Sequence, residues 1–315
     1  MTEDALSGPL FSVVIPTYGR PRFLAEAVTS VLAQTVDDLE CIVVDDASPE
    51  PVTAPEDERV RVVRREVNGG PAAARNTGVQ HASGRYVAFL DDDDCFTPDR
   101  LAIALRGLRR APVALCWSRN FDEPPEKGRG RILEGDVSDT IREGVIPNLG
   151  QTAFVRSVFL PFDERLPASQ DVEWWLRMAQ QVPVATVAEV GRLLRRHDGV
   201  RHLNDLHARV RNQQVILELH ADYFAVHRKA RAFQWRQVGL LALQAGESAT
   251  ARTALWRSVR ARPAARTVWH LFRAHFPALA HLRRYTWPVR RPREDHRPGP
   301  RGSARSCSEH GEKAL

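Results

Sequence analysis

The residues of this chain best suited to chemistry are four consecutive carboxylates that follow an apolar stretch: Asp91, Asp92, Asp93 and Asp94. Residues 86–90 predict a buried strand, because a short apolar run between polar residues is typical of strands covered on both faces. In open α/β sheets, ligands lie beyond the carboxyl ends of the strands, where these acids would stand. Adjacent carboxylates repel one another, and a hard divalent cation shared with substrate phosphate oxygens supplies the missing counter-charge. The run predicts a metal–phosphate site, with a solvated acidic loop as the alternative.

Two earlier strands are expected to end in polar residues at the same edge. The first, 11–15, stops at Pro16, which cannot donate to a ladder, and Thr17 and Tyr18 follow it. The second, 39–44, ends at Asp45 and Asp46. Because parallel strands place their carboxyl ends together, these side chains should meet the aspartate run.

The alternation of apolar periods predicts an α/β fold with a mostly parallel central sheet flanked by helices. The expected further elements are a strand at 60–63, helices at 22–34, 72–81 and 98–110, and a strand at 113–117. Residues 119–150 should form loops or short strands bordering the site, followed by an apolar segment at 154–159, a helix at 171–181 with Trp174 and Trp175 in its apolar surface, and a strand at 184–190.

From residue 205 the pattern becomes wholly helical and predicts a smaller all-α region. One helix is expected over 209–231, then a pair of helices at 235–245 and 248–260 turning at Gly246, and a last helix at 264–275. The predicted organisation is a flexible leader at 1–10, an α/β domain at 11–204, a helical domain at 205–287 and a disordered basic tail at 288–315.

Composition and charge bound the class of protein. The 315 residues, 43% hydrophobic and 27% charged, are typical of a soluble protein, and no apolar run is long enough for a membrane span. Cys41 and Cys116 lie in apolar runs and predict core thiols in a reducing compartment, so a cytoplasmic protein is expected. Residues 1–191 hold 20 basic and 30 acidic side chains, whereas residues 192–315 hold 25 basic and 9 acidic. The basic half favours an anionic partner: an anionic membrane surface such as the inner face of a membrane, an acidic partner or nucleic acid.

Four ordered motifs resemble one enzyme family, the inverting family-two nucleotide-sugar glycosyltransferases with the GT-A fold. The motifs are VVIPTY at 13–18, IVVDDAS at 42–48, GPAAARN at 70–76 and FLDDD at 89–93, and the resemblance covers roughly residues 11–200. Four motifs in order are far more specific than any one of them. The resemblance implies a metal-dependent enzyme that moves one sugar from a nucleotide-diphosphate sugar, most often a UDP-sugar, to an acceptor hydroxyl. The acceptor would be a glycan, a lipid-linked sugar or another hydroxyl compound, in cell-surface polysaccharide or glycoconjugate synthesis.

The resemblance also assigns roles to residues. Binding of the nucleotide sugar would fall to Pro16, Thr17, Tyr18, Asp46, Arg75, Asp92, Arg196 and His197, and binding of Mn²⁺ or Mg²⁺ to Asp91 and Asp93. Among these, Arg196 and His197 belong to a basic segment that also includes Arg195, for which a solvated strand end is the alternative.

The general base that the resemblance implies is Asp171, at the start of a helix. The family commonly has Glu before this position, and Gln170 stands there instead, which changes the charge around the base. The alternative is that Asp171 merely caps its helix. The processive members' Gln-x-x-Arg-Trp motif is missing from the sequence, which favours single transfer over polymerisation.

The sequence leaves two other functions open. A nucleotidyltransferase shares the architecture and the acid cluster, but residues 16–20 make a poor glycine-rich phosphate loop. A non-catalytic protein acting through its basic helices is the second. Nucleic acid is the less favoured partner for it, because Trp235, Trp256 and Trp269 fall at core-like helical positions.

Overall fold

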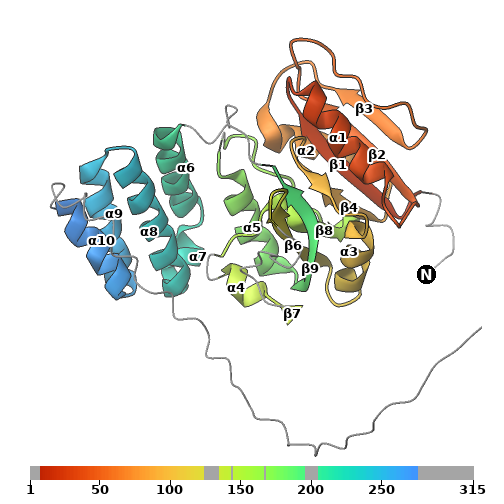
Figure 1. Ribbon diagram of the computed structural model, residues 1–315. Coiled ribbons are helices and arrows are strands. Elements are labelled where there is room, and N and C mark those ends of the chain that lie inside the picture. Colours follow the sequence, from red (N-terminus) through yellow and green to blue (C-terminus); the bar gives the residue numbers. More distant parts are fainter. Residues whose placement is uncertain (1–7, 124–134, 143–144, 167, 196–204, 276–315) are drawn as a thin grey trace, which may run out of the picture. The chain divides into compact units, whose positions relative to one another are not determined.

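The computed structural model describes residues 8–123, 135–142, 145–166, 168–195 and 205–275. All of them belong to one compact unit, Met1–His275 (Figure 1). The expected leader up to residue 7, the region around the boundary at 204 and the expected tail at 288–315 lie outside the described residues. The domain boundaries at 10, 204 and 287 stay predictions.

A nine-stranded mixed sheet forms the first part of the chain and confirms the predicted α/β fold. Its parallel side has the order β3-β2-β1-β4, formed by β1 (Phe11–Thr17), β2 (Leu39–Asp45), β3 (Val60–Arg64) and β4 (Tyr86–Phe89). The other side is mixed and continues through β8 (Thr152–Val155), β6 (Val113–Asn120), β9 (Val184–Leu194) and β5 (Cys95–Phe96), with β7 (Gly135–Asp136) pairing with β9. Among the described strand pairs on this side, β6–β9 is parallel and the others are antiparallel.

Strand β1 continues through Pro16, so the prediction that it stops there was wrong. The N–H of Leu90 donates to the carbonyl of Val14, which shows that the backbone groups of the even-numbered residues of β1 point toward β4. Since β4 ends at Phe89, opposite Val14, the missing N–H of Pro16 lies beyond the paired part of that edge. On its other edge β1 pairs with β2 as far as Thr17.

Helices cover both faces of the sheet, and the alternation along β1 directs its side chains to each. Val13 and Ile15 pack with α1 (Pro21–Leu32) and α3 (Arg100–Leu108), whereas Val14 packs with α2 (Gly70–His81) and α5 (Gln170–Gln181). Helix α2 approaches the sheet closely at Gly78, where an added Cβ would stand 2.2 Å from Cγ1 of Val14. A short helix, α4 (Ser138–Arg142), completes the covering of the α5 face.

Trp174 and Trp175 are fully buried, which confirms their predicted place in the core. The Trp174 ring stacks on Phe162, with ring centroids 5.2 Å apart, and its Nε1 donates to the carbonyl of Leu160. Neither ring is therefore exposed as a platform for a sugar.

The predicted single helix over 209–231 was wrong, because the chain leaves helical geometry twice. It forms α6 (Leu206–Leu219), α7 (Ala221–Val226) and the start of α8 (Arg228–Gln244), with breaks at His220 and His227. The His220 ring lies 3.2 Å from Glu173 of α5, and the His227 ring stacks on Tyr223. These contacts fix the two breaks, which a local apolar period cannot encode.

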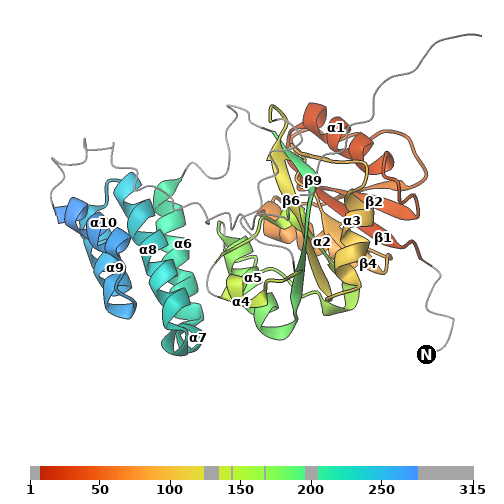
Figure 2. The same ribbon diagram turned by 60° about the horizontal axis from the view of Figure 1, so that its bottom comes forward.

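Helices α8, α9 (Ser248–Ala261) and α10 (Ala265–His275) lie side by side (Figures 1 and 2). The predicted turn at Gly246 is confirmed, with φ at +78°. The predicted core positions of Trp256 and Trp269 were wrong: their side chains are 52% and 39% exposed. Helix α9 buries Ala251, Ala254 and Leu255 instead, so the neighbouring Trp256 points outward.

The helical region packs directly on α5. Leu166 and Leu176 share an apolar cluster with Val210 and Leu217 of α6. The Asn212 amide donates to the carbonyl of Ala168 at 3.2 Å, at the entry to α5. The helix that carries the predicted base is thus held from both sides.

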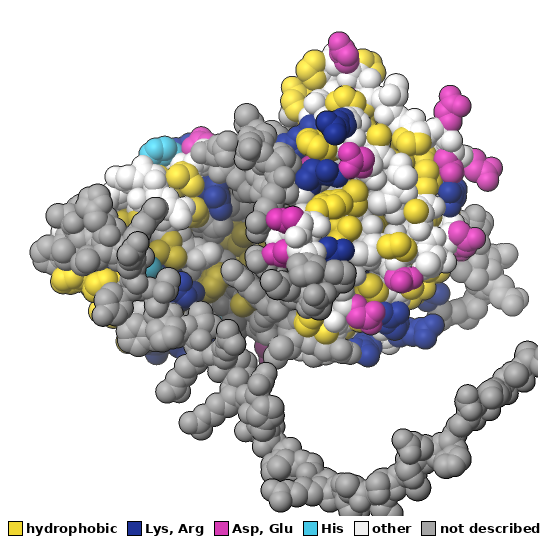
Figure 3. Space-filling model, in the orientation of Figure 1, with side chains coloured by type: hydrophobic (Ala, Val, Ile, Leu, Met, Phe, Trp, Pro, Cys, Tyr) yellow, Lys and Arg dark blue, Asp and Glu magenta, His cyan; other side chains and the backbone are white. Residues whose placement is uncertain are grey.

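Acidic and basic side chains are interspersed on the face of the α/β region seen in Figure 3. The acidic side chains that residues 1–191 hold in excess therefore do not form a single negatively charged patch on that face.

Candidate active site

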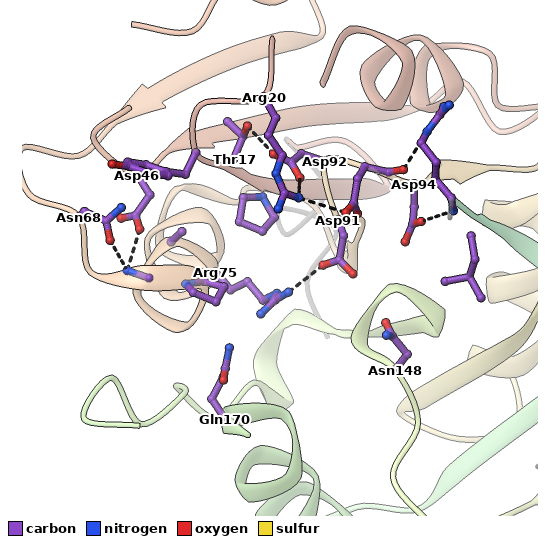
Figure 4. Close-up of a pocket in the computed structure, with 18 of the residues that line it drawn as sticks. Thr17, Arg20, Asp46, Asn68, Arg75, Asp91, Asp92, Asp94, Asn148 and Gln170 are labelled. Carbon is purple, nitrogen blue, oxygen red and sulfur yellow. Dashed lines mark hydrogen bonds and ion pairs between the residues drawn. The ribbon is translucent and has the colours of Figure 1, made fainter. Parts of the chain in front are cut away.

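A cavity of about 330 Å³ lies at the carboxyl ends of β1, β2 and β4, as the sequence predicts. Eight of the residues predicted to bind the donor or the metal line it: Pro16, Thr17, Tyr18, Asp46, Arg75, Asp91, Asp92 and Asp93. Of these eight, Figure 4 labels five, whose side chains converge from the strand ends and from α2: Thr17, Asp46, Arg75, Asp91 and Asp92. The parallel register of β1, β2 and β4 brings these distant residues together.

On the β1 side, Asp92 is held by Thr17, the last residue of that strand, and by Arg20 in the loop that follows. Thr17 Oγ1 donates to Asp92 Oδ2 at 2.7 Å, and Arg20 Nη1 lies 3.3 Å from Asp92 Oδ1. The same Arg20 atom lies 3.0 Å from Asp93 Oδ2. One guanidinium thus bridges two neighbouring carboxylates.

The other two acids of the run face a buried arginine of β9. Arg192 is 2% exposed, and its Nη2 donates to Asp91 Oδ2 at 2.9 Å. Its Nε donates to Asp94 Oδ2, also at 2.9 Å, and its Nη1 to the amide oxygen of Asn148. Asp94 Oδ1 accepts from the backbone N–H of Arg195. This side of the site is a desolvated network of charges.

Arg75, on α2, holds the remaining oxygen of Asp91, with Nη2 to Oδ1 at 2.8 Å. Its guanidinium carbon lies 5.9 Å from the ring centroids of both Phe89 and Phe162. The side chain is 7% exposed, and its Nε has no hydrogen-bond acceptor among the described residues. Because this Nε is itself buried, Arg75 borders the cavity through the rest of its side chain.

Asp46 joins the end of β2 to the start of α2. Its Oδ2 accepts from the N–H of Gly70 at 2.7 Å, its Oδ1 accepts from that of Gly69, and Arg65 also donates to it. The following residue, Ala47, has φ at +59°, a left-handed conformation that non-glycine residues rarely adopt. Such strain is concentrated at functional sites, where surrounding structure holds it in place.

The four acids do not share one electrostatic environment. Burial raises the pKa of Asp92 to about 6, because Thr17 and Arg20 offset only part of the cost of desolvation. For Asp91, burial acts in the same direction, but Arg192 and Arg75 outweigh it and hold the pKa below its usual value. Asp91 thus stays ionised, whereas the groups around Asp92 do not fully offset the cost of burying its charge.

The donor set suits a hard divalent cation shared with a ligand. No three His, Cys, Asp or Glu side chains form a metal cluster in the part of the chain that the structure describes. Asp91 and Asp93 nevertheless offer two carboxylates at the cavity wall, and Mg²⁺ typically takes one or two carboxylates plus substrate phosphate oxygens. The residues present fit that kind of site, in which the cation would compete with Arg20, Arg75 and Arg192.

Asp171 lies in the first turn of α5 and is not its N-cap, which is Ser169. The Asp171 Oδ1 accepts from the N–H of Val172 at 2.9 Å. Burial raises the pKa of Asp171 above its usual value, with Asp91 adding to the effect and Arg75 opposing it. Ser169 has φ at +61°, so strained backbone leads into this turn. A carboxylate in such a place is a stronger base than an exposed one.

Asp171 does not line the first cavity. Its neighbour Gln170 does, while Asp171 lines a second cavity of about 820 Å³. The two side chains therefore face two adjoining spaces from one helical turn. Arg196 and His197, predicted to bind the donor, lie outside the described residues.

Comparison with known proteins identifies the family. The model of "Glycosyl transferase family 2" matches residues 12–156. A "Putative colanic acid biosynthesis glycosyl transferase WcaA" of Escherichia coli is 30% identical over 192 residues, which are 55% of this chain and 67% of the relative. The chain belongs to glycosyl transferase family 2. An "Uncharacterized glycosyltransferase" of Rickettsia felis is also 30% identical, over 58% of this chain, but the chain spans only 32% of that relative's length.

Solved structures support the same fold for this family 2 chain. The S. aureus TarS 1–349 structure superposes with a TM-score of 0.60 at 18% identity, covering 84% of this chain and 86% of the TarS 1–349 chain. The mannosyltransferase PcManGT of Pyrobaculum calidifontis, solved with GDP-Man and Mn²⁺, has a TM-score of 0.52 at 20% identity, covering 87% of this chain and 82% of the other. At these identities the likeness concerns the fold.

Several site residues of this family 2 chain were not predicted from its sequence. Those with polar side chains that line the first cavity include Arg20, Asn68, Asn148, Gln170 and Arg192. Arg192 had a detectable signal, because an arginine inside the apolar stretch 190–194 must be paired if it is buried. Asn148 had none, because it lies in the segment 119–150, for which no motif was found.

Proposed function

We propose that this protein is an inverting, non-processive glycosyltransferase that moves one sugar from a nucleotide-diphosphate sugar to an acceptor hydroxyl, in cell-surface polysaccharide or glycoconjugate synthesis. One observation carries the proposal. Acidic and basic side chains at the ends of β1, β2 and β4 line one cavity, together with Gln170. The residue after Gln170 is Asp171, a partly buried carboxylate whose pKa is raised.

The donor would lie in the first cavity. Tyr18 is 42% exposed there, which leaves its ring face available for stacking on a nucleobase. Arg75 lines this cavity, and its guanidinium charge suits the negative charge of a diphosphate. TarS structures contain UDP or UDP-GlcNAc, and the PcManGT structure contains GDP-Man. A UDP-sugar is the favoured donor.

A divalent cation, Mn²⁺ or Mg²⁺, belongs to this proposal, held by Asp91 and Asp93. When bound, it would neutralise negative charge on the departing diphosphate. Asp92 would contact the ribose, with Thr17 fixing its carboxyl orientation.

Asp171 would act as the general base. The acceptor oxygen forms a bond to the anomeric carbon, the bond from that carbon to the diphosphate oxygen breaks, and the acceptor proton passes to an Asp171 oxygen. The leaving group departs from the face opposite the attack, so the anomeric configuration inverts. Burial of Asp171 favours this role, because its raised pKa strengthens it as a base.

Peripheral association with an anionic membrane at the cytoplasmic face is a further part of the proposal. In the described residues no helix is both long and apolar enough to span a bilayer. Trp256, Trp269 and Phe272 are exposed on α9 and α10, among arginines such as Arg260. Aromatic and basic side chains together are typical of surfaces that bind at a membrane interface. Sedimentation of the full chain with anionic vesicles, but not with neutral ones, is the expected result.

The donor proposal is tested by thermal unfolding of the full chain with Mn²⁺ and a panel of nucleoside diphosphates. A ligand present at one hundred times its dissociation constant adds about 2.7 kcal/mol of stability. We expect one nucleotide to raise the melting temperature in the presence of metal, and Asp93→Ala to abolish the effect. Asp139→Ala, an exposed carboxylate away from the cavity, is the matched control. If no nucleotide shifts the melting temperature, the proposed donor site is wrong.

The role of Asp171 is tested by Asp171→Asn, which keeps the shape and removes the base. Donor turnover should fall by about 10²-fold or more, in keeping with loss of general base catalysis, while the nucleotide-induced shift in melting temperature stays. An Asp171→Asn protein with undiminished turnover would assign the base elsewhere.

A further inference from the structure

The second cavity, of about 820 Å³, is bounded by two parts of the chain. The α/β region contributes residues of β6 and β9 and the start of α5, including Asp171 and Thr186. Helices α6 and α8 contribute the opposite side, including Arg209 and Gln213. The volume lies within the range of about 300–1,000 Å³ that is usual for ligand sites.

Two buried oxygen atoms of this wall lack a partner. Thr186 is 1% exposed and Gln213 is 7% exposed, and neither Thr186 Oγ1 nor Gln213 Oε1 has a hydrogen-bond partner among the described residues. A buried polar atom left unpaired is destabilising, so native proteins rarely keep one without a reason. A ligand that donates hydroxyl protons would satisfy both.

The wall is rich in amides and poor in charge. Its five glutamines come from three separate places in the chain: Gln151, Gln213, Gln234, Gln237 and Gln244. Each amide both donates and accepts, which matches hydroxyl groups that also do both. The charged side chains of this wall are Arg209 and Asp171. An acceptor with several phosphates or carboxylates would find a single cation here.

Apolar side chains complete the wall, among them Phe233, Leu240 and Ile146. Sugar rings have an apolar C–H face and a rim of hydroxyls, so they need both kinds of surface. A site with a few placed polar groups on an apolar lining is the usual form of a small-molecule site.

We propose that this second cavity is the acceptor site and that it takes a neutral glycan, whose hydroxyls the glutamines of α6 and α8 and Thr186 recognise. The inference rests on the proposed transferase function, because it makes Asp171 the group that meets the acceptor hydroxyl. It assigns a function to the helical region: α6 and α8 select the acceptor, and the α/β region binds the donor.

Saccharide binding to the full chain tests this, measured by ligand-observed NMR without any donor. The probes are neutral disaccharides of glucose, galactose and N-acetylglucosamine, each beside the matching uronate disaccharide. We expect at least one neutral disaccharide to bind more tightly than its uronate partner. Gln213→Ala and Gln237→Ala should each weaken that binding about two- to tenfold, the value of one neutral hydrogen bond.

Gln214→Ala is the matched control, because Gln214 is the next residue of α6 and does not line the cavity. It should leave saccharide binding unchanged. Tighter binding of the uronates, equal effects of Gln213→Ala and Gln214→Ala, or no binding of any saccharide would overturn the proposal. The nucleotide-induced melting shift, measured on the same variants, separates the two hypotheses: its absence counts against the donor site, while loss of saccharide binding alone counts against the acceptor site.

Discussion

Replacing Arg192 by leucine should destabilise the fold far more than replacing an exposed arginine. Arg192 is almost fully buried between Asp91 and Asp94, and its loss leaves both carboxylates without their nearest cation. Removing one partner of a buried ion pair costs about 3–5 kcal/mol. For a chain of this size, each kcal/mol lowers the melting temperature by about 2–4 °C, so a fall of about 6–20 °C is expected.

The assay is thermal and urea unfolding of the full-length protein at neutral pH, with two companion variants. Arg106→Leu removes an ion pair with Glu189 in which both side chains are about half exposed, and such pairs contribute at most about 1 kcal/mol. Arg192→Leu combined with Asp94→Leu removes one of the stranded charges and should recover part of the loss. If Arg192→Leu unfolds at the same temperature as Arg106→Leu, the buried network is not a source of stability.

Two further predictions concern packing and pH. Gly78→Ala should destabilise the protein by about 1–3 kcal/mol in urea unfolding, because the added Cβ would collide with Val14 and push α2 away from the sheet. The control is Gly246→Asn, at a turn where an added Cβ meets no neighbouring atom. Glu173→Gln should cost more stability at neutral pH than at about pH 3, which lies below the usual pKa of Glu. Burial works against ionisation of Glu173, but His220 and Arg177 outweigh it and lower the pKa. Its contribution is therefore present above the unfolded-state pKa and lost as the pH falls through the folded-state pKa; equal losses at both pH values would contradict this.

The parallel half of the sheet and the contents of the first cavity could be predicted because they depend on local patterns. Apolar runs mark β1, β2 and β4, and the polar residues at their ends meet through parallel register alone. The resemblance then placed Arg75 at the same edge, and the structure puts it on Asp91.

The partners of the acids could not be predicted, because they come from far along the chain. Arg192 lies 101 residues from Asp91, on a strand whose place in the sheet depends on tertiary packing. The short strand β5 and the antiparallel β8 escaped prediction for the same reason. The second cavity could not be predicted from the sequence either. Its glutamines come from residue 151 and from helices α6 and α8, and they share no motif.

Helix α5 presents Gln170 to one cavity and Asp171 to the other, and its Glu173 and Leu176 contact the helical region. A ligand in either cavity that shifts this helix also alters the walls of its neighbour. Any such coupling must be reciprocal: the factor by which the donor changes the affinity for the acceptor equals the factor by which the acceptor changes that for the donor. Gln170 and Asp171 share the first turn of α5, directly after the strained Ser169, so a coupling between the two cavities would act through this turn.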